Sequence, residues 1–252
     1  MMKKRLWSRW ILALAVVWPF MAAAHDRVRE KENFDFDWKF ILNADDQANA
    51  GMQVSETGWQ DVQLPHDWSI SQNFDPKLSG SNGHLPGGIG WYRKMFRVDK
   101  KDKGRRIAVL FDGIYSRSDV YVNGQHLGFR PYGFCYQEYD LTPYLNYGAE
   151  NVLAVRVNNP LEHDSVARWY TGAGIYRHAW LVKTAEVHVA SYGTYVTTPV
   201  VTAERAEVRV RTSVANEAER TKTLSVRQQI TDGEGRTVVQ SGKQALQVAA
   251  GQ

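Results

Sequence analysis

The chain has 252 residues, with 31 basic side chains, 27 acidic side chains and one cysteine. Four of the basic residues and none of the acidic ones lie in residues 1–24, so the rest of the chain is charge-balanced and lacks the basic surface typical of proteins that bind nucleic acid or anionic membranes. A single cysteine excludes an intrachain disulfide, and Cys135, which lies between aromatic residues, is predicted to be a buried structural thiol.

Residues 1–24 are predicted to be a secretory signal peptide. Basic residues at the start are followed by an apolar stretch over residues 10–20 and by three alanines that end at Ala24. The apolar stretch is shorter than the roughly 20 residues that a membrane-spanning helix needs. A retained membrane anchor is the alternative. We therefore expect an exported protein, periplasmic or extracellular, with no membrane association after cleavage.

The remainder of the chain shows the two-residue period of β-strands. Apolar, β-branched and aromatic residues form runs of strand length at 107–111, 118–122, 152–157 and 179–182. The Asn123-Gly124 pair follows the second of these runs and is typical of a tight hairpin turn, because both turn residues need a positive φ. No stretch carries a helical apolar stripe over three turns. The sequence therefore predicts an all-β protein.

Composition divides the chain into two parts near residue 185. Six tryptophans lie between residues 26 and 184, and none follows. Residues 185–252 instead alternate Val and Thr with charged residues, and Asp232 to Gly235 predicts a second hairpin. An immunoglobulin-like sandwich needs about 100 residues. We therefore predict a first domain over 25–184 and a truncated sandwich over 185–252.

A long irregular segment, residues 64–90, is rich in Pro and Gly and is followed directly by the aromatic pair Trp91-Tyr92. Irregular segments of this length inside a compact domain are usually functional or disordered, so this one is predicted to line a site. Flat aromatic rings stack on sugar rings, while charged side chains hydrogen-bond sugar hydroxyls. The aromatic candidates are Trp68, Trp91, Tyr92, Trp169 and Tyr170, and the polar candidates are His66, Asp67, Arg93 and Arg168. For each aromatic residue, packing in the core is the alternative.

Five motifs occur in a consistent order along the chain: Leu-Pro-His-Asp-Trp at 64–68, Leu-Pro-Gly-Gly-Ile-Gly-Trp-Tyr-Arg-Lys at 85–94, Asp-Gly-Ile-Tyr-Ser at 112–116, Val-Tyr-Val-Asn-Gly-Gln-His-Leu-Gly at 120–128, and Arg-Trp-Tyr-Thr-Gly-Ala-Gly-Ile-Tyr-Arg at 168–177. Together they resemble the N-terminal sugar-binding domain of glycoside hydrolase family 2, of the β-galactosidase type. The resemblance implies a jelly-roll sandwich for residues 34–184, followed by part of the family's first immunoglobulin-like domain.

In that family two carboxylates on a separate (β/α)8 barrel cut the sugar. We expect no such barrel within these 252 residues, so no catalytic residue is predicted. No cysteine–histidine cluster has zinc spacing and no calcium loop is present, so neither a metal nor another cofactor is expected.

The resemblance implies that one rim of the first domain completes the subsite for the terminal sugar. Arg168 is then the first candidate for a hydroxyl contact and Asp67 the second, with Trp91, Trp169 and Tyr170 as aromatic contacts. Two alternatives stay open. Asp67 would instead tie down its own loop, and Arg168 would instead pair with Asp164 or Glu162. Asp35 and Asp37 are expected to face solvent on one strand.

The function expected from the sequence is that of the N-terminal fragment of an exported β-glycosidase. It would supply part of a carbohydrate subsite to a barrel in cis or in trans, and it would be inactive alone. A stand-alone carbohydrate-binding module and a docking subunit are the alternatives. The sugar preference stays open, because galactosidases, mannosidases and glucuronidases share this domain.

Overall fold

The computed structural model describes residues 29–43, 45–80, 83–160 and 169–252. Strands and short 3₁₀ segments make up the regular secondary structure of these residues, so the predicted all-β class is confirmed. The predicted signal peptide lies outside them. None of the described helical segments is long and apolar enough to cross a bilayer.

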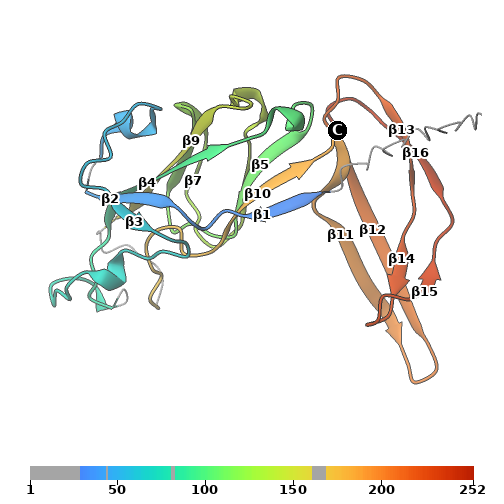
Figure 1. Ribbon diagram of the computed structural model, residues 1–252. Helices are drawn as coiled ribbons and strands as arrows, with labels where there is room; N and C mark the ends of the chain where they lie inside the picture. The colour runs from blue at the N-terminus through green and yellow to red at the C-terminus, as the bar shows by residue number, and fades with distance from the viewer. Residues whose placement is uncertain (1–28, 44, 81–82, 161–168) are drawn as a thin grey trace, which may run out of the picture.

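The first ten strands build one sandwich (Figure 1). In chain order they are β1 (Glu30–Asn33), β2 (Trp38–Leu42), β3 (Gln60–Val62), β4 (Gly88–Arg97), β5 (Arg106–Phe111), β6 (Ser118–Val122), β7 (Gln125–Arg130), β8 (Gln137–Asp140), β9 (Glu150–Asn159) and β10 (Ala179–Thr184). One sheet has the order β3-β2-β4-β9-β6-β7 and the other β1-β10-β5-β8. The four runs predicted from the sequence all lie within strands β5, β6, β9 and β10.

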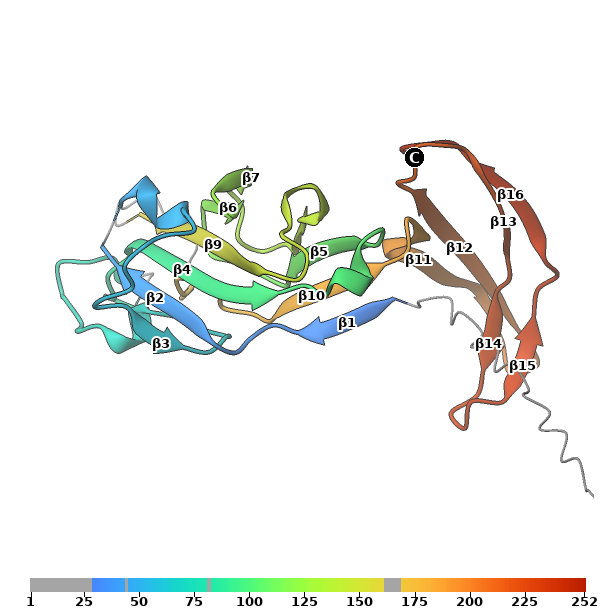
Figure 2. The same cartoon turned by 45° about the horizontal axis from the view of Figure 1, so that its top comes forward.

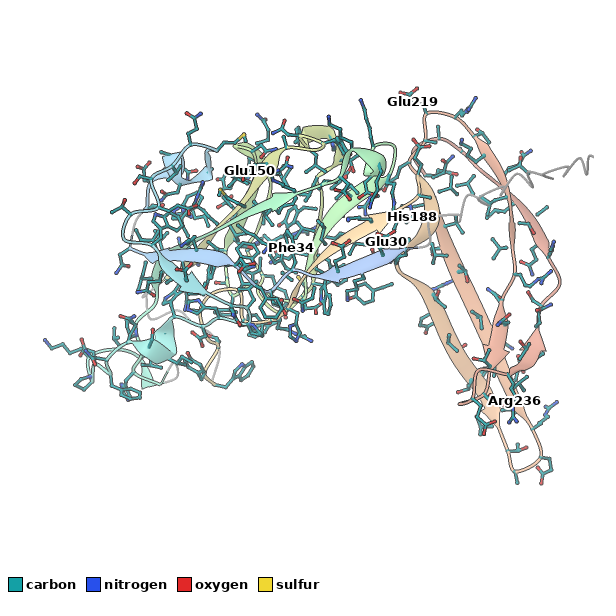
Figure 3. The ribbon with its side chains drawn as sticks, viewed as in Figure 1. Glu30, Phe34, Glu150, His188, Glu219 and Arg236 are labelled. Atoms are coloured by element: carbon teal, nitrogen blue, oxygen red, sulfur yellow. The ribbon has the colours of Figure 1, made fainter. Side chains whose placement is uncertain are left out.

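The space between the two sheets is the main core. Alternate residues of the central strands point inward, as a pleated backbone requires, and they include Trp38, Tyr92, Phe111, Val155 and Leu181. Phe34 joins them in the dense layer of side chains that Figure 3 shows between the sheets. The sandwich therefore has a rigid interior on which loops at its ends can be positioned.

The Asn123-Gly124 turn connects β6 to β7, as predicted. Both residues have positive φ, 51° and 85°, as a tight two-residue hairpin turn requires. The Asn123 side chain also accepts a hydrogen bond from the Val152 backbone N–H at 2.8 Å. The turn thus fixes the register of β6 and β7 and ties them to β9.

The six remaining strands form a second unit of three two-stranded ribbons (Figures 1 and 2). They are β11 (Val187–Val201), β12 (Ala206–Asn216), β13 (Lys222–Val226), β14 (Gln229–Thr231), β15 (Thr237–Gln240) and β16 (Gln244–Val248), paired β11-β12, β13-β16 and β14-β15. The hairpin expected at Asp232–Gly235 joins β14 to β15. Figure 2 shows this unit crossing the long direction of the first sandwich at a steep angle.

The second unit is loosely filled. A cavity of about 730 Å³ lies between its ribbons, lined by valines such as Val196, Val210 and Val239. Val196 and Val239 are each 54% exposed. Since burial of apolar area is the main stabilising term in folding, this unit gains much less from its core than the first sandwich does.

Two expectations about single residues are wrong. Asp35 is buried rather than solvent-facing, because residues 34–37 form a turn between β1 and β2 and the carboxylate accepts hydrogen bonds from the Ala179 N–H at 2.8 Å and from the ring of His178 at 2.7 Å. Cys135 is half-buried in the loop between β7 and β8, so it does not belong to the core.

Candidate functional site

Two chain segments more than 100 residues apart lie side by side at one end of the first sandwich. The backbone N–H of His66 donates to the Ile175 carbonyl at 2.8 Å, and that of Trp68 donates to the Ala173 carbonyl at 3.1 Å. Trp68, Ala173 and Ile175 are buried against the inner face of the six-stranded sheet. Hydrophobic burial therefore anchors both segments and leaves the residues between the anchors at the surface.

Asp67 links the two segments through its carboxylate. Oδ1 accepts hydrogen bonds from the Ser69 N–H at 2.9 Å and from the Ala173 N–H at 3.0 Å. Oδ2 accepts a hydrogen bond from the Tyr170 hydroxyl at 2.5 Å. A carboxylate oxygen has two lone-pair sites, so Oδ2 retains an acceptor position for a further partner such as a sugar hydroxyl.

The hydroxyl of Tyr170 is held in its protonated form. Burial and the hydrogen bond to Asp67 raise its pKa far above the ordinary value for tyrosine. Tyr170 is therefore a hydrogen-bond donor to Asp67 throughout the physiological pH range.

A hydrogen bond between His66 and Tyr92 joins the segment around Asp67 to strand β4. The Nδ1 atom of His66 lies 2.8 Å from the Tyr92 hydroxyl, and Tyr92 is fully buried. Burial lowers the pKa of His66, although the charge of Asp67 next to it acts in the opposite direction. A neutral imidazole can accept the hydrogen bond of the Tyr92 hydroxyl, so the pair is satisfied without a buried charge.

Two glycines permit this close packing. Gly172 has φ 74°, and a Cβ atom there would lie 2.9 Å from Oδ2 of Asp67. Gly174 has φ 118°, and a Cβ atom there would lie only 2.2 Å from the Tyr92 hydroxyl. The Gly-Ala-Gly sequence is therefore a steric requirement of the packing against Asp67 and Tyr92.

Trp169 stands outside this network and is 61% exposed. Its ring centroid lies 6.5 Å from that of Phe134, which in turn lies 5.7 Å from Tyr132 and 5.1 Å from Tyr115. Tyr132 and Phe134 are also exposed. We call Tyr132, Phe134 and Trp169 the aromatic strip, since their rings follow one another in contact and are exposed to solvent.

Of the five residues predicted for the sugar subsite, the structure joins Asp67 and Tyr170 by a hydrogen bond and places Trp169, which precedes Tyr170 in the chain, at the surface. Arg168 and its alternative partners Glu162 and Asp164 lie outside the described residues. For Asp67, the structure shows the loop-tying contact with Ser69 that was left open as its alternative, together with the link to the other segment.

The prediction for Trp91 as a stacking surface is wrong. Trp91 is fully buried on the opposite face of the six-stranded sheet, under the 3₁₀ segment η1 (Gln47–Ala50), where it packs with Ala50, Ala154 and Tyr121. Its ring faces are therefore covered by protein. The tryptophan at 68 is likewise core.

Arg93 is also structural. Its guanidinium is almost completely buried and donates to the carbonyls of Asn49 and Gly51 and to the carboxylate of Glu56 at 3.2 Å. These contacts hold the chain that covers Trp91. No donor of this side chain faces the candidate site.

Phe134 and Tyr132 were not predicted as site residues. Their signal in the sequence is the aromatic density of residues 132–136, where three of five residues are aromatic. From the sequence alone, that density indicates an apolar setting for Cys135. Only the structure shows that the loop between β7 and β8 reaches Trp169.

The arrangement is suited to recognition. It offers stacking surface on the aromatic strip and an acceptor on Asp67, which are the two components of a sugar contact. Within the described parts of the chain, no group of three or more His, Cys, Asp or Glu residues could hold a metal ion.

Comparison with known proteins decides the family. The model of the glycosyl hydrolases family 2 sugar binding domain matches residues 32–185. The chain belongs to glycosyl hydrolase family 2. This match covers the first sandwich from within β1 to the end of β10 and includes both segments of the candidate site.

Individual relatives agree with the family assignment. The chain is 45% identical over 216 residues to a β-galactosidase of Bacteroides ovatus, covering 84% of this chain and 25% of that protein. It is 34% identical over 242 residues to a β-glucuronidase of Formosa agariphila, covering 85% of this chain and 24% of that protein. The chain thus spans about a quarter of the length of the curated relatives it matches.

Solved structures share the fold. A family 2 member from Bacteroides cellulosilyticus superposes with a TM-score of 0.76 at 40% identity, over 86% of this chain and 29% of that one. A family 2 β-glucuronidase superposes with a TM-score of 0.79 at 32% identity, over 89% of this chain and 25% of that one. Both superpositions exceed the extent of the first sandwich, so they also cover part of the second unit.

Proposed function

We propose that this chain is the N-terminal recognition part of an exported β-glycosidase of the β-galactosidase type. In this proposal the end of the first sandwich that carries Asp67, Trp169 and Tyr170 forms one wall of the pocket for the terminal sugar. A catalytic barrel, in cis or in trans, supplies the two carboxylates that hydrolyse the terminal β-glycoside. The chain alone is inactive.

The observation that carries the proposal is the exposure of Trp169. The other five described tryptophans of the first sandwich are buried or half-buried, whereas Trp169 is exposed and directly precedes Tyr170, whose hydroxyl is bound to Asp67. The relatives named above are glycosidases, which supports a sugar as the partner of this ring.

A chimera tests the proposal. Residues 29–184 of this chain would replace the matching domain of the Bacteroides ovatus β-galactosidase, and kcat and KM would be measured with a chromogenic β-galactoside. We expect an active chimera in which Trp169→Ala raises KM at least fivefold. Tyr195→Ala, in a chimera extended to residue 252, changes an exposed tyrosine of the second unit and is the control. A folded, active chimera that is indifferent to Trp169→Ala would contradict the proposal.

The alternative is a stand-alone carbohydrate-binding module, and the same exposed Trp169 favours it. Isothermal titration of the chain alone with galactose and β-linked oligosaccharides separates the two functions. A shared pocket predicts no measurable binding at millimolar sugar. A module predicts binding that Trp169→Ala removes.

A further inference from the structure

A concavity lies on the outer face of the six-stranded sheet. It has a volume of about 530 Å³, within the range of roughly 300–1,000 Å³ that is typical of small-molecule sites. Ile89 of β4 and Asn158 of β9 are directly paired in the sheet and line it together. We call this concavity the outer-face pocket.

The outer-face pocket is separate from the candidate site. Successive residues of a strand point to opposite faces, so Asn158 and Asn159 diverge. Asn159 points inward and donates a hydrogen bond to the Gly172 carbonyl at 3.2 Å, on the side of Asp67. Asn158 lines the outer-face pocket instead. The sheet itself therefore lies between the two sites.

The polar groups of the pocket are held in place by the backbone. Asn43 has φ 60°, and its N–H donates to the Ile89 carbonyl at 2.7 Å. A Cβ atom at Gly88 would lie 2.8 Å from the Asn43 side-chain oxygen, so this amide rests directly on the glycine. Asn43 and Asn158 thus offer two amide groups, each able to donate and accept, on a preformed surface.

Arg117 supplies the charge of the pocket. Its backbone is in the left-handed region at φ 44°, which is uncommon for a residue other than Gly, Asn or Asp, and its N–H is bound to the Pro131 carbonyl. The guanidinium is exposed, and among the described residues no carboxylate pairs with it.

The other charges near the pocket compensate one another. Asp45 lines the pocket, but both of its oxygens are bound by Arg156, at 2.7 and 3.1 Å. Arg156 also lies 3.7 Å from Asp119, whose other oxygen contacts His126 at 2.9 Å. Among the residues that the structure describes, Arg117 is therefore the positive group of this region without a carboxylate partner.

We propose that the outer-face pocket binds a sugar unit that carries a carboxylate. A guanidinium matches a carboxylate in charge and in its forked geometry. The two amides are suited to ring hydroxyls, and Ile89 with Pro160 provides an apolar surface for the C–H face of the ring. The proposal is independent of the role of Trp169.

NMR titration of the isotopically labelled chain tests the proposal. The ligands are D-glucuronate and D-galacturonate, with D-glucose and D-galactose as neutral counterparts and acetate as a carboxylate without a ring, all at constant ionic strength. We expect a uronate to shift the side-chain amide signals of Asn43 and Asn158 with saturation at millimolar concentration. Binding of the neutral sugar and of acetate should be at least fivefold weaker.

Two variants assign the contact. Arg117→Gly removes the guanidinium while fitting the positive φ, and it should weaken uronate binding at least tenfold. Asn158→Asp introduces a negative charge and should weaken it similarly. Trp169→Ala should leave it unchanged. The proposal is overturned by the absence of saturable shifts at Asn43 and Asn158, by acetate binding equal to that of the uronate, or by unaltered affinity in folded Arg117→Gly.

Discussion

Among single residues, Asp67 and Tyr170 matter most for the candidate site, because one hydrogen bond joins their side chains. Both residues come from irregular segments, so their relative position is fixed by this bond and by the two backbone contacts of the same carboxylate. All six tryptophans outside residues 1–24 lie in the first sandwich, so tryptophan fluorescence follows this domain without interference from the second unit.

Replacing Tyr170 by phenylalanine removes the donor to Asp67 and keeps the ring. Because hydrogen bonds to charged groups contribute about 1.5–3 kcal/mol, we expect Tyr170→Phe to lower the free energy of unfolding by about 1–2 kcal/mol. Urea unfolding followed by tryptophan fluorescence measures it. Tyr195→Phe, in the second unit, should leave the transition in place, and an equal shift in both variants would rule out a specific role for the bond.

His66 predicts a dependence of stability on pH. Burial lowers its pKa in the folded state, so the unfolded chain binds a proton more readily than the folded one. The contribution is fully present above the ordinary histidine pKa of about 6.5 and is lost as pH falls below that value towards the folded pKa. The unfolding free energy of the first sandwich should therefore fall between pH 7.5 and pH 5.

His66→Gln is the control for the pH effect, because glutamine can still accept a hydrogen bond from the Tyr92 hydroxyl but does not titrate. The fall in stability between pH 7.5 and pH 5 should be smaller in this variant than in the unmodified chain. An identical fall in both would show that other groups cause it.

At the scale of elements, the strands could be predicted and the site could be predicted only in part. The runs that became β5, β6, β9 and β10 carry their period in local sequence, and the Asn123-Gly124 turn is a local signal as well. Asp35 alternates with phenylalanines in the same way, but it is buried through His178 and Ala179, 143 and 144 residues away. Such a contact has no local signature.

Trp91 shows why aromatic content did not identify the whole site. Its position on the outer face of β4 follows from alternation with Tyr92, and an outer-face tryptophan is a reasonable candidate for stacking. The segment that covers it, held by Arg93, comes from residues 47–56. Trp169 has no such cover within the described residues, and this difference arises from tertiary packing alone.

Gly174→Ala tests the close packing of the two segments. The added methyl group would lie 2.2 Å from the Tyr92 hydroxyl and would also impose strain at φ 118°. Overpacking of this kind costs about 1–3 kcal/mol, so we expect a loss of stability of about 2 kcal/mol or more by urea unfolding. Gly235→Ala has a similar positive φ with open space around it, and it separates backbone strain from the clash. Equal losses in the two variants would exclude the clash as the cause.

At the scale of the whole molecule, the two units differ in how much apolar surface they bury. The first sandwich encloses Trp38, Tyr92 and Phe111 completely, whereas Val196 and Val239 of the second unit remain half exposed around an open cavity. The salt bridge of Arg106 with Glu217 at 2.7 Å and the ring contact of Tyr136 with Tyr192 at 4.6 Å join the units. These contacts are few, so we expect each unit to unfold separately from the other.

Limited proteolysis measures that difference. We expect trypsin to cut first within residues 186–252, where arginines lie on exposed ribbons, and to leave the tryptophan fluorescence of the first sandwich unchanged. Mass spectrometry of the fragments identifies the cuts. Early cleavage inside residues 29–184 with an intact second unit would contradict the prediction that the first sandwich is the more stable unit.

We propose that this chain recognises the sugar and that another domain hydrolyses it. The most direct test is to measure hydrolysis of a chromogenic β-galactoside by the purified chain, residues 25–252. The proposed function predicts no turnover above spontaneous hydrolysis in buffer at any pH between 5 and 8, because it assigns the paired carboxylates of a glycosidase to another domain. Turnover that a single carboxylate substitution in this chain abolishes would contradict it.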